Sequence, residues 1–315
     1  MKKILVTNAS FAKYSIKAQK ILEDYGLGIV RPKQSVVSEH ELFGCLDDVV
    51  AIITGLEPIT RKIIKSAPGL KVIAKHGIGV DNIDINSAKE QGVIVLNAPG
   101  TNREAVADLV FGLMLSLARK IPKSDSQVRA GEWPKVFGQA VWGKTLGVIG
   151  LGVIGKSVVQ RAKGFNMKVL AFDKYWSKEY ADANGVIYSD IDGILKESDF
   201  VSLHVPLMEE TRNLIGADQL KLMKPTAYLI NAARGGVVDE AALYKALSGG
   251  KIAGAGIDVF SSEPPVKSPL LELENVIVTP HMGGFTDGAL SLTSEFVAQA
   301  VIDALEGKEL KSRIV

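Results

Sequence analysis

The sequence reads Gly150-Leu151-Gly152-Val153-Ile154-Gly155 at the point where an apolar run, 145–149, gives way to a helical pattern, 156–163. The apolar run predicts a strand. The first glycine permits a tight turn, the second lets the main chain approach a pyrophosphate, and the third lets a helix pack closely on the sheet. The helix N-terminus adds unpaired N–H groups for the phosphates. This stretch therefore predicts a dinucleotide-binding turn.

An acidic residue follows the next strand at the spacing that this prediction requires. The apolar run 168–172 ends directly before Asp173. A carboxylate at this place accepts hydrogen bonds from both hydroxyls of a ribose and repels a 2′-phosphate, so Asp173 favours NAD over NADP. Lys174 weakens this preference, since a lysine tolerates a phosphate.

The composition bounds the class of protein. The 315 residues carry a net charge of +2, which provides no electrostatic basis for binding nucleic acid or an anionic membrane. Cys45 is the only cysteine, which excludes disulfides within the chain and multi-cysteine metal sites. The longest apolar stretch, 105–118, contains Asp108 and is too short to span a bilayer. We therefore expect a cytoplasmic protein without a metal site.

Short apolar runs alternate with helical patterns along the whole chain. The runs lack a strict polar alternation, which is typical of strands buried on both faces of a parallel sheet. The predicted strands are 4–7, 49–54, 71–74, 93–96, 145–149, 168–172, 200–204, 227–231, 253–260 and 276–279. The predicted helices are 16–25, 59–67, 84–91, 101–120, 121–133, 156–163, 239–247 and 286–305.

These elements predict an α/β fold with two doubly wound parallel-sheet domains. The long helices at 101–120 and 286–305 suit connections between the domains. We therefore expect residues 1–98 and 286–315 to form a flavodoxin-like substrate-binding domain. Residues 99–285 then form a Rossmann-type NAD-binding domain inserted into it.

An arginine follows the predicted strand 227–231. It lies in the segment Asn231-Ala232-Ala233-Arg234-Gly235-Gly236. Ligands of open parallel sheets bind beyond the carboxyl ends of the strands. The guanidinium of Arg234 can hold a carboxylate with two parallel hydrogen bonds and polarise a neighbouring carbonyl.

A hydride transfer from an alcohol also needs a group that accepts the hydroxyl proton. His281 follows the last predicted strand, and Glu263 can orient its ring. His76 and His204 also follow strands and are rivals on the residues alone, whereas His40 lies in a solvated helical pattern. Trp133 and Trp142 suit packing or a contact between subunits.

Together, these motifs resemble the NAD-dependent D-2-hydroxyacid dehydrogenase family over nearly the whole chain. The matching segments are Lys75-His76-Gly77-Ile78-Gly79-Val80-Asp81-Asn82-Ile83-Asp84, Asn97-Ala98-Pro99-Gly100, 150–155, 231–236, 258–265 and 279–284.

The resemblance assigns roles to individual residues. It implies that Arg234, Glu263 and His281 are catalytic, with Glu263 and His281 as the acid–base pair. It implies substrate contacts at Lys75, Gly77, Ile78, Gly79, Asn102 and Arg234. It implies cofactor contacts at Ile78, Gly150, Gly152, Val153, Ile154, Gly155, Asp173, His204, Val205, Pro206, Ala232, Asp258 and Gly284, with Asp258 facing the nicotinamide carboxamide. A homodimer formed through the cofactor domain, around 101–145, is also implied.

Within the family, the chain is most similar to members that oxidise 3-phosphoglycerate to 3-phosphohydroxypyruvate in serine biosynthesis. Many of these have Arg-Ser at the place of Thr54-Gly55 and arginine at the place of Lys75, which weakens the case for a phosphorylated substrate. The alternatives are a glyoxylate or hydroxypyruvate reductase, a broad D-2-hydroxyacid dehydrogenase, and an NAD(H)-sensing corepressor-like protein. Because the sequence ends soon after 286–305, we expect no regulatory domain and no inhibition by serine.

Overall fold

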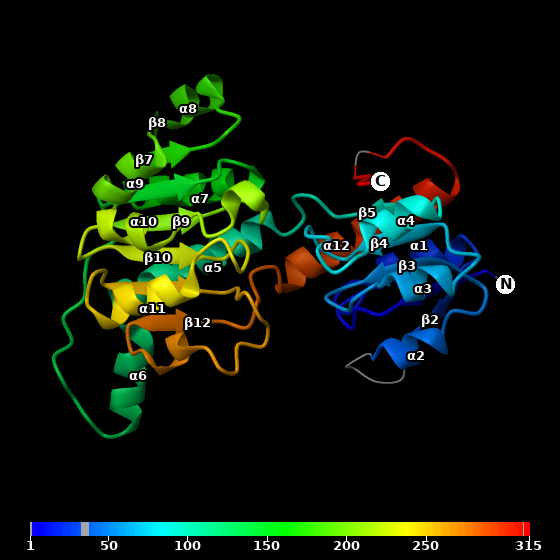
Figure 1. Cartoon of the computed structure of the whole chain (residues 1–315), viewed down its shortest axis with the longest axis horizontal. Helices are drawn as coiled ribbons and strands as arrows, with labels where there is room; N and C mark the ends of the chain where they lie inside the picture. The colour runs from blue at the N-terminus through cyan, green and yellow to red at the C-terminus, as the bar shows by residue number, and fades with distance from the viewer. Residues whose placement is uncertain (1, 33–37, 311) are drawn as a thin grey trace. The chain divides into compact units, whose positions relative to one another are not determined.

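The computed structural model describes residues 2–32, 38–310 and 312–315. The chain divides into two compact units (Figure 1). Unit 1 comprises Met1–Asn102 and Gly284–Val315, and unit 2 comprises Arg103–Gly283. The boundaries expected from the sequence were 98/99 and 285/286. Residues 99–102 also belong to unit 1, where the N–H of Ala98 donates to the Gly77 carbonyl at 2.8 Å and Thr101 contacts Thr293 at 2.7 Å.

Unit 2 is built on a seven-stranded parallel sheet. Its strands are β6 (Thr145–Ile149), β7 (Lys168–Phe172), β8 (Val186–Tyr188), β9 (Phe200–Leu203), β10 (Tyr228–Asn231), β11 (Gly254–Ile257) and β12 (Val276–Val278). They lie in the order β12-β11-β10-β9-β6-β7-β8. The order reverses between β6 and β9, which is the topological switch point where nucleotides bind in Rossmann folds.

Helices cover both faces of this sheet. They are α5 (Arg103–Ala118), α7 (Val153–Gly164), α8 (Lys178–Asn184), α9 (Ile191–Glu197), α10 (Ala217–Leu222) and α11 (Glu240–Ser248). Helix α6 (Ile121–Arg129) follows α5 and has no buried residue. Alternate residues of a strand enter different cores: Tyr228 and Ile230 pack with α5 and α7, and Leu229 packs with α9 to α11. The strands are thus apolar on both faces, as the sequence pattern predicts.

Unit 1 has a five-stranded parallel sheet in the order β2-β1-β3-β4-β5, the flavodoxin-like order. The strands are β1 (Lys3–Val6), β2 (Gly28–Val30), β3 (Val49–Thr54), β4 (Val72–Lys75) and β5 (Ile94–Leu96). The helices are α1 (Lys17–Asp24), α2 (Glu39–Phe43), α3 (Arg61–Lys65), α4 (Ile85–Glu90) and α12 (Asp287–Leu305). Helix α12 packs beside α1 through Val297, Ala298 and Val301, which are buried.

Several elements differ from those predicted. Helix α7 begins at Val153, three residues before the predicted start at 156, and Gly152 is its N-cap. Strand β11 ends at Ile257, and residues 258–260 enter a loop. Short elements such as β2 and β8 were not predicted, because three residues are too few to show a period of hydrophobicity.

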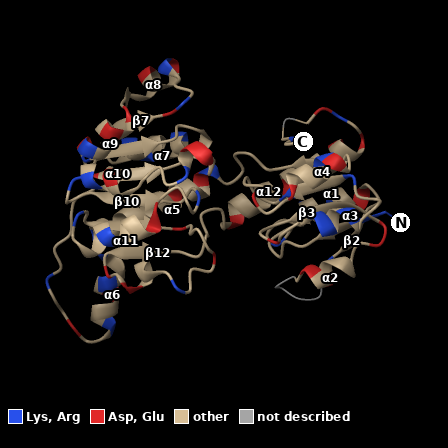
Figure 2. Cartoon of the chain, viewed as in Figure 1, with Lys and Arg blue, Asp and Glu red and all other residues tan. Residues whose placement is uncertain are grey.

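Charged residues of both signs are interspersed over the elements of each unit (Figure 2). Among the described residues, no helix combines the length and the apolar character that crossing a bilayer requires.

Candidate active site

The predicted site residues of unit 2 follow the carboxyl ends of its strands. Because the strands are parallel, these ends share one edge of the sheet. Gly150 follows β6, Asp173 follows β7, His204 follows β9, Arg234 lies beyond β10 and Asp258 follows β11. In open α/β sheets this edge is the place where ligands bind.

The glycine turn has the geometry that a dinucleotide requires. Gly150 has φ +99°, a conformation that favours glycine. A Cβ at Gly155 would lie 2.1 Å from the Gly150 carbonyl oxygen, whereas a Cβ at Gly152 would meet open space. Helix α7 begins here with no side-chain cap and no acidic residue in its first turn. Its amide groups thus suit a pyrophosphate.

The carboxylate of Asp173 is fixed beside this turn. Its Oδ2 accepts from the N–H of Leu151 at 2.6 Å, and its Oδ1 accepts from the N–H of Tyr175 at 2.7 Å. These two bonds join the glycine turn to the loop after β7. Each carboxylate oxygen retains a further lone pair, so the group can also accept from a ribose diol.

The two rival histidines are neutral, because their surroundings lower the pKa of each ring to about 4. His204 Nε2 lies 2.8 Å from Ser202 Oγ, and burial lowers the pKa of His204 to about 4. Its Nδ1 is buried without a hydrogen-bond partner in the described part of the chain. A Cβ at Gly150 would lie 2.6 Å from the His204 carbonyl, so His204 borders the glycine turn. Val205 and Pro206 continue the chain from it.

His76 belongs to the interior of unit 1. Its Nδ1 lies 3.3 Å from Asn8 Nδ2, and its Nε2 lies 2.9 Å from Ser294 Oγ. Burial lowers its pKa to about 4. With both ring nitrogens engaged, His76 is a structural residue.

His281 and Glu263 form a hydrogen-bonded pair. His281 Nδ1 lies 2.8 Å from Glu263 Oε2, and the two residues are 18 positions apart. Because an ionised carboxylate only accepts hydrogen bonds, the Nδ1 atom carries a proton and Nε2 is left as the acceptor. The N–H of Phe260 donates to Glu263 Oε1 at 3.0 Å, which fixes the carboxylate. Both side chains are about one-third exposed, at 32% and 34%, so the ring is accessible.

Asp258 organises the loop that carries His281. Its Oδ1 accepts from Thr279 Oγ1 at 2.6 Å and from the N–H of Met282 at 2.8 Å. Its Oδ2 accepts from the N–H of Gly283 at 2.9 Å. The side chain is 1% exposed. Asp258 was expected to face the nicotinamide. Its contacts with this loop were not predicted, because they join residues more than 20 positions apart.

Arg234 lies in a turn that packs closely against the loop before Glu263. Asn231 Nδ2 donates to the Arg234 carbonyl at 3.0 Å, and Arg234 Nη1 donates to the Ala233 carbonyl at 2.7 Å. A Cβ at Gly235 would lie 2.0 Å from the Phe260 carbonyl oxygen, so only glycine permits this approach. Ala232 precedes the turn beyond β10. The close approach brings the segment of Arg234 beside the segment of Glu263.

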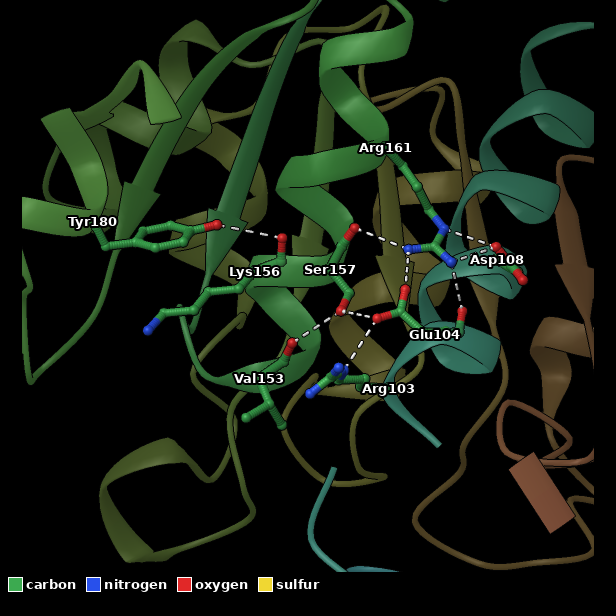
Figure 3. A network of polar contacts seen from close by, with 8 residues as sticks. All are labelled: Arg103, Glu104, Asp108, Val153, Lys156, Ser157, Arg161 and Tyr180. Carbon is green, nitrogen blue, oxygen red and sulfur yellow. Dashed lines mark hydrogen bonds and ion pairs between the residues drawn. The ribbon is translucent and has the colours of Figure 1, made fainter. Parts of the chain in front are cut away.

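A polar network that was not predicted from the sequence joins the first turn of α5 to α7. Figure 3 shows this network. Arg161 donates to Glu104 Oε2 at 2.8 Å and to Asp108 Oδ1 at 2.7 Å. Ser157 Oγ donates to Glu104 Oε1 at 3.1 Å and lies 3.2 Å from the Val153 carbonyl. The hydrogen bond from Arg161 lowers the pKa of Glu104. The network fastens the helix that follows the glycine turn.

The remaining predicted residues belong to unit 1. They are Lys75, Gly77, Ile78, Gly79, Asn102 and Gly284. Gly77 has φ +153°, and Asn97 Nδ2 donates to the Ile78 carbonyl at 2.9 Å. A Cβ at Gly284 would lie 3.0 Å from Asn102 Nδ2. Residues 76–79 therefore form the loop directly after β4.

The glycine turn, the carboxylate of Asp173 and the histidine–glutamate pair share the carboxyl edge of one Rossmann sheet. This combination defines a dehydrogenase that uses a dinucleotide.

Comparisons with known proteins specify the family. Residues 111–283 match the family model described as D-isomer specific 2-hydroxyacid dehydrogenase, NAD binding domain. The chain belongs to this family, whose members are NAD-dependent D-2-hydroxyacid dehydrogenases.

Individual relatives carry different names. The chain is 45% identical over its whole length to a D-3-phosphoglycerate dehydrogenase of Methanocaldococcus jannaschii, of which it spans 59%. It is 44% identical over 84% of its length to a glyoxylate reductase of Thermococcus litoralis, of which it covers 82%. The apo structure of D-lactate dehydrogenase from Escherichia coli superimposes over both whole chains with a TM-score of 0.88 and 30% identity.

Proposed function

We propose that this chain interconverts a D-2-hydroxyacid and its 2-oxoacid with NAD as the hydride carrier. The observation that carries the proposal is the 2.8 Å contact between His281 Nδ1 and Glu263 Oε2. The contact lies in the unit that has the dinucleotide turn. It leaves Nε2 of the ring as a proton acceptor at an accessible place.

His281 acts as the general base in oxidation. Its Nε2 removes the hydroxyl proton of the substrate, and Glu263 stabilises the charged ring that results. Held at the glycine turn and by Asp173, NAD⁺ would supply the acceptor for the hydride on the carbon that bears this hydroxyl, so that alcohol and NAD⁺ would give ketone, NADH and one proton. In reduction, Nε2 returns the proton to the carbonyl oxygen.

Arg234 binds the substrate carboxylate and polarises the reacting carbonyl. Its planar guanidinium supplies two parallel donors, which a lysine lacks. From the family resemblance we also propose substrate contacts at Gly77, Ile78 and Gly79, through their main-chain N–H groups, and at Lys75 and Asn102.

The cofactor contacts are proposed on the geometry of the turn. The amide groups of Val153, Ile154 and Gly155 bind the pyrophosphate. Asp173 accepts from the ribose hydroxyls and favours NAD over NADP. The remaining proposed contacts are Ile78, Gly150, Gly152, His204, Val205, Pro206, Ala232, Asp258 and Gly284.

Two substrate classes are candidates. The first is 3-phosphoglycerate, which would place the chain in serine biosynthesis in the cytoplasm. The relative from Methanocaldococcus jannaschii supports it by name. The second is an unphosphorylated acid such as glyoxylate or hydroxypyruvate, and the relative from Thermococcus litoralis supports it by name.

We propose a homodimer formed through unit 2. Three aromatic side chains between α6 and β6 are strongly exposed: Trp133 at 88%, Phe137 at 81% and Trp142 at 64%. Exposed aromatic groups of this size are typical of interfaces. Sedimentation of the wild type should show a dimer, and Trp133→Ala combined with Phe137→Ala should shift it towards monomer. A monomeric wild type would refute this assembly.

The activity is tested by following NADH absorbance with 3-phosphoglycerate, 3-phosphohydroxypyruvate, glyoxylate, hydroxypyruvate, pyruvate and D-lactate. His281→Ala should lower kcat by roughly a hundredfold or more, the scale of a positioned acid–base group. NADH binding should persist in this variant. His40→Ala, on the exposed surface of α2, is the matched control. A wild type that binds NADH and turns over none of these acids would instead favour an NAD(H)-sensing protein.

A further inference from the structure

Polar residues gather at the carboxyl edge of the unit 1 sheet. Thr7 and Asn8 follow β1, Thr54 ends β3 and Lys75 ends β4. Strands β1, β3 and β4 are neighbours in the sheet, so these residues lie side by side. Like the corresponding edge of unit 2, this edge is where a parallel sheet binds ligands.

Lys75 is bound into the loop that follows β3. The residue is 6% exposed. Its Nζ donates to the Gly55 carbonyl and to Asn82 Oδ1, the latter at 2.7 Å. Asn82 Nδ2 donates in turn to the Gly55 carbonyl at 3.1 Å and to the Glu57 carbonyl at 2.6 Å. To bind this ammonium group, a ligand phosphate would have to displace the Gly55 carbonyl and Asn82 Oδ1.

Glu57 fixes a negative charge on the other side of Gly55. Its Oε2 accepts from the N–H of Gly55 at 2.8 Å, from Thr7 Oγ1 at 2.9 Å and from Thr54 Oγ1 at 3.3 Å. The N–H of Gly55 therefore holds the carboxylate of Glu57, and the carbonyl of Gly55 holds the ammonium of Lys75. Gly55 thus contacts both charged side chains through its main chain.

The remaining groups at this edge add little to attract an anion. Arg31 follows β2, and its guanidinium donates to the carbonyls of Phe11 at 3.0 Å and Asn8 at 3.4 Å. Position 55 has no side chain to donate, and a Cβ there would lie 2.6 Å from Asn8 Nδ2. Arg31 and Lys75 thus already donate to protein oxygens, whereas Glu57 is a fixed negative charge at this edge.

We propose that Glu57 determines specificity, so that this edge selects 2-oxoacids with an uncharged distal group over those that carry a phosphate. The proposal rests on the proposed dehydrogenase function and chooses between its two substrate classes. A phosphate brought to this edge meets the Glu57 carboxylate, and repulsion between like charges is an effective way to reject a competing ligand. An uncharged hydroxymethyl group meets only the hydrogen-bonding groups.

The test compares two acids that differ only in the phosphate, hydroxypyruvate and 3-phosphohydroxypyruvate, each with NADH at low ionic strength. The wild type should show a kcat/KM at least about tenfold higher for hydroxypyruvate. Glu57→Gln keeps the shape and an acceptor oxygen but removes the charge, so the ratio should move by about tenfold towards the phosphorylated acid, mainly through KM.

Glu90→Gln is the matched control. Glu90 lies on α4, where it pairs with Arg61 at the surface, and its substitution makes the same change of charge in unit 1. It should leave the ratio at the wild-type value. A wild type that prefers 3-phosphohydroxypyruvate overturns the proposal without any variant, as does an equal shift in Glu90→Gln or no shift in Glu57→Gln. Absence of turnover with every acid of the panel refutes the dehydrogenase function instead.

Discussion

Asp258 holds His281 in place through the main chain. The Asp258 carbonyl accepts from the N–H of His281 at 2.9 Å, and its carboxylate accepts from the next two amides, those of Met282 and Gly283. His281 has φ +51°, a left-handed conformation that is unfavourable for a residue with a side chain. The buried carboxylate compensates for this strain, because three donors surround it in a fixed geometry.

Asp258→Asn should destabilise the protein and displace His281. The amide replaces one oxygen by a donor that faces another donor, at a cost of about 1–3 kcal/mol in the free energy of unfolding. Urea denaturation measures this loss, and kcat should fall with it. Asp125→Asn, on the exposed face of α6, is the control. Unchanged stability and kcat in Asp258→Asn would show that the loop of His281 keeps its conformation without the Asp258 carboxylate.

Glu263→Gln should lower kcat by about 10- to 100-fold, because the neutral amide can hold the ring but cannot stabilise its charged form. The dissociation constant of NADH, measured by fluorescence, should change little, since Glu263 contacts Phe260 and His281 rather than the glycine turn. A variant with normal kcat would remove Glu263 from the acid–base pair.

Gly235→Ala should be strongly destabilising. The added methyl group would lie 2.0 Å from the Phe260 carbonyl oxygen, so two main-chain segments must separate. We expect a loss of about 3 kcal/mol or more, in the range of severe overpacking. Gly112→Ala, inside α5 with open space around its Cβ, should instead stabilise by about 0.5–1 kcal/mol. Thermal unfolding compares the two, and equal melting temperatures would contradict the close approach.

Acid should destabilise unit 1 through His76. Burial lowers the folded-state pKa of His76 to about 4, below its unfolded value of about 6.5. Between these values the unfolded chain binds more protons, so stability falls as the pH drops through 6.5 towards 4. From pH 7 to pH 5 this histidine should account for about 2 kcal/mol of lost stability.

His76→Gln removes this titration, so urea denaturation of the variant should show a correspondingly smaller loss between pH 7 and pH 5. The exposed His40, replaced by Gln, should leave the pH dependence as in the wild type. Equal losses in His76→Gln and the wild type would mean that folding does not change the pKa of His76.

Much of the fold followed from local sequence pattern. Apolar runs without polar alternation predicted both parallel sheets, and their strand lengths agree within a few residues with β3, β6 and β7. The short strands β2 and β8 were missed, because three residues cannot show a hydrophobic period. Their formation depends on neighbours that lie elsewhere in the sequence.

By itself, the sequence determined the dinucleotide turn and the α/β class, because glycine spacing and strand periodicity are local properties of the chain. On the residues alone the three histidines that follow strands were rivals, and the tertiary structure distinguishes them. It lowers the pKa of His76 and His204 to about 4 and places His281 against Glu263. It also decided that Asp258 holds the loop of His281 and that Glu57 accompanies Lys75. Burial and charge pairing arise between residues distant in the chain, so no local pattern encodes them.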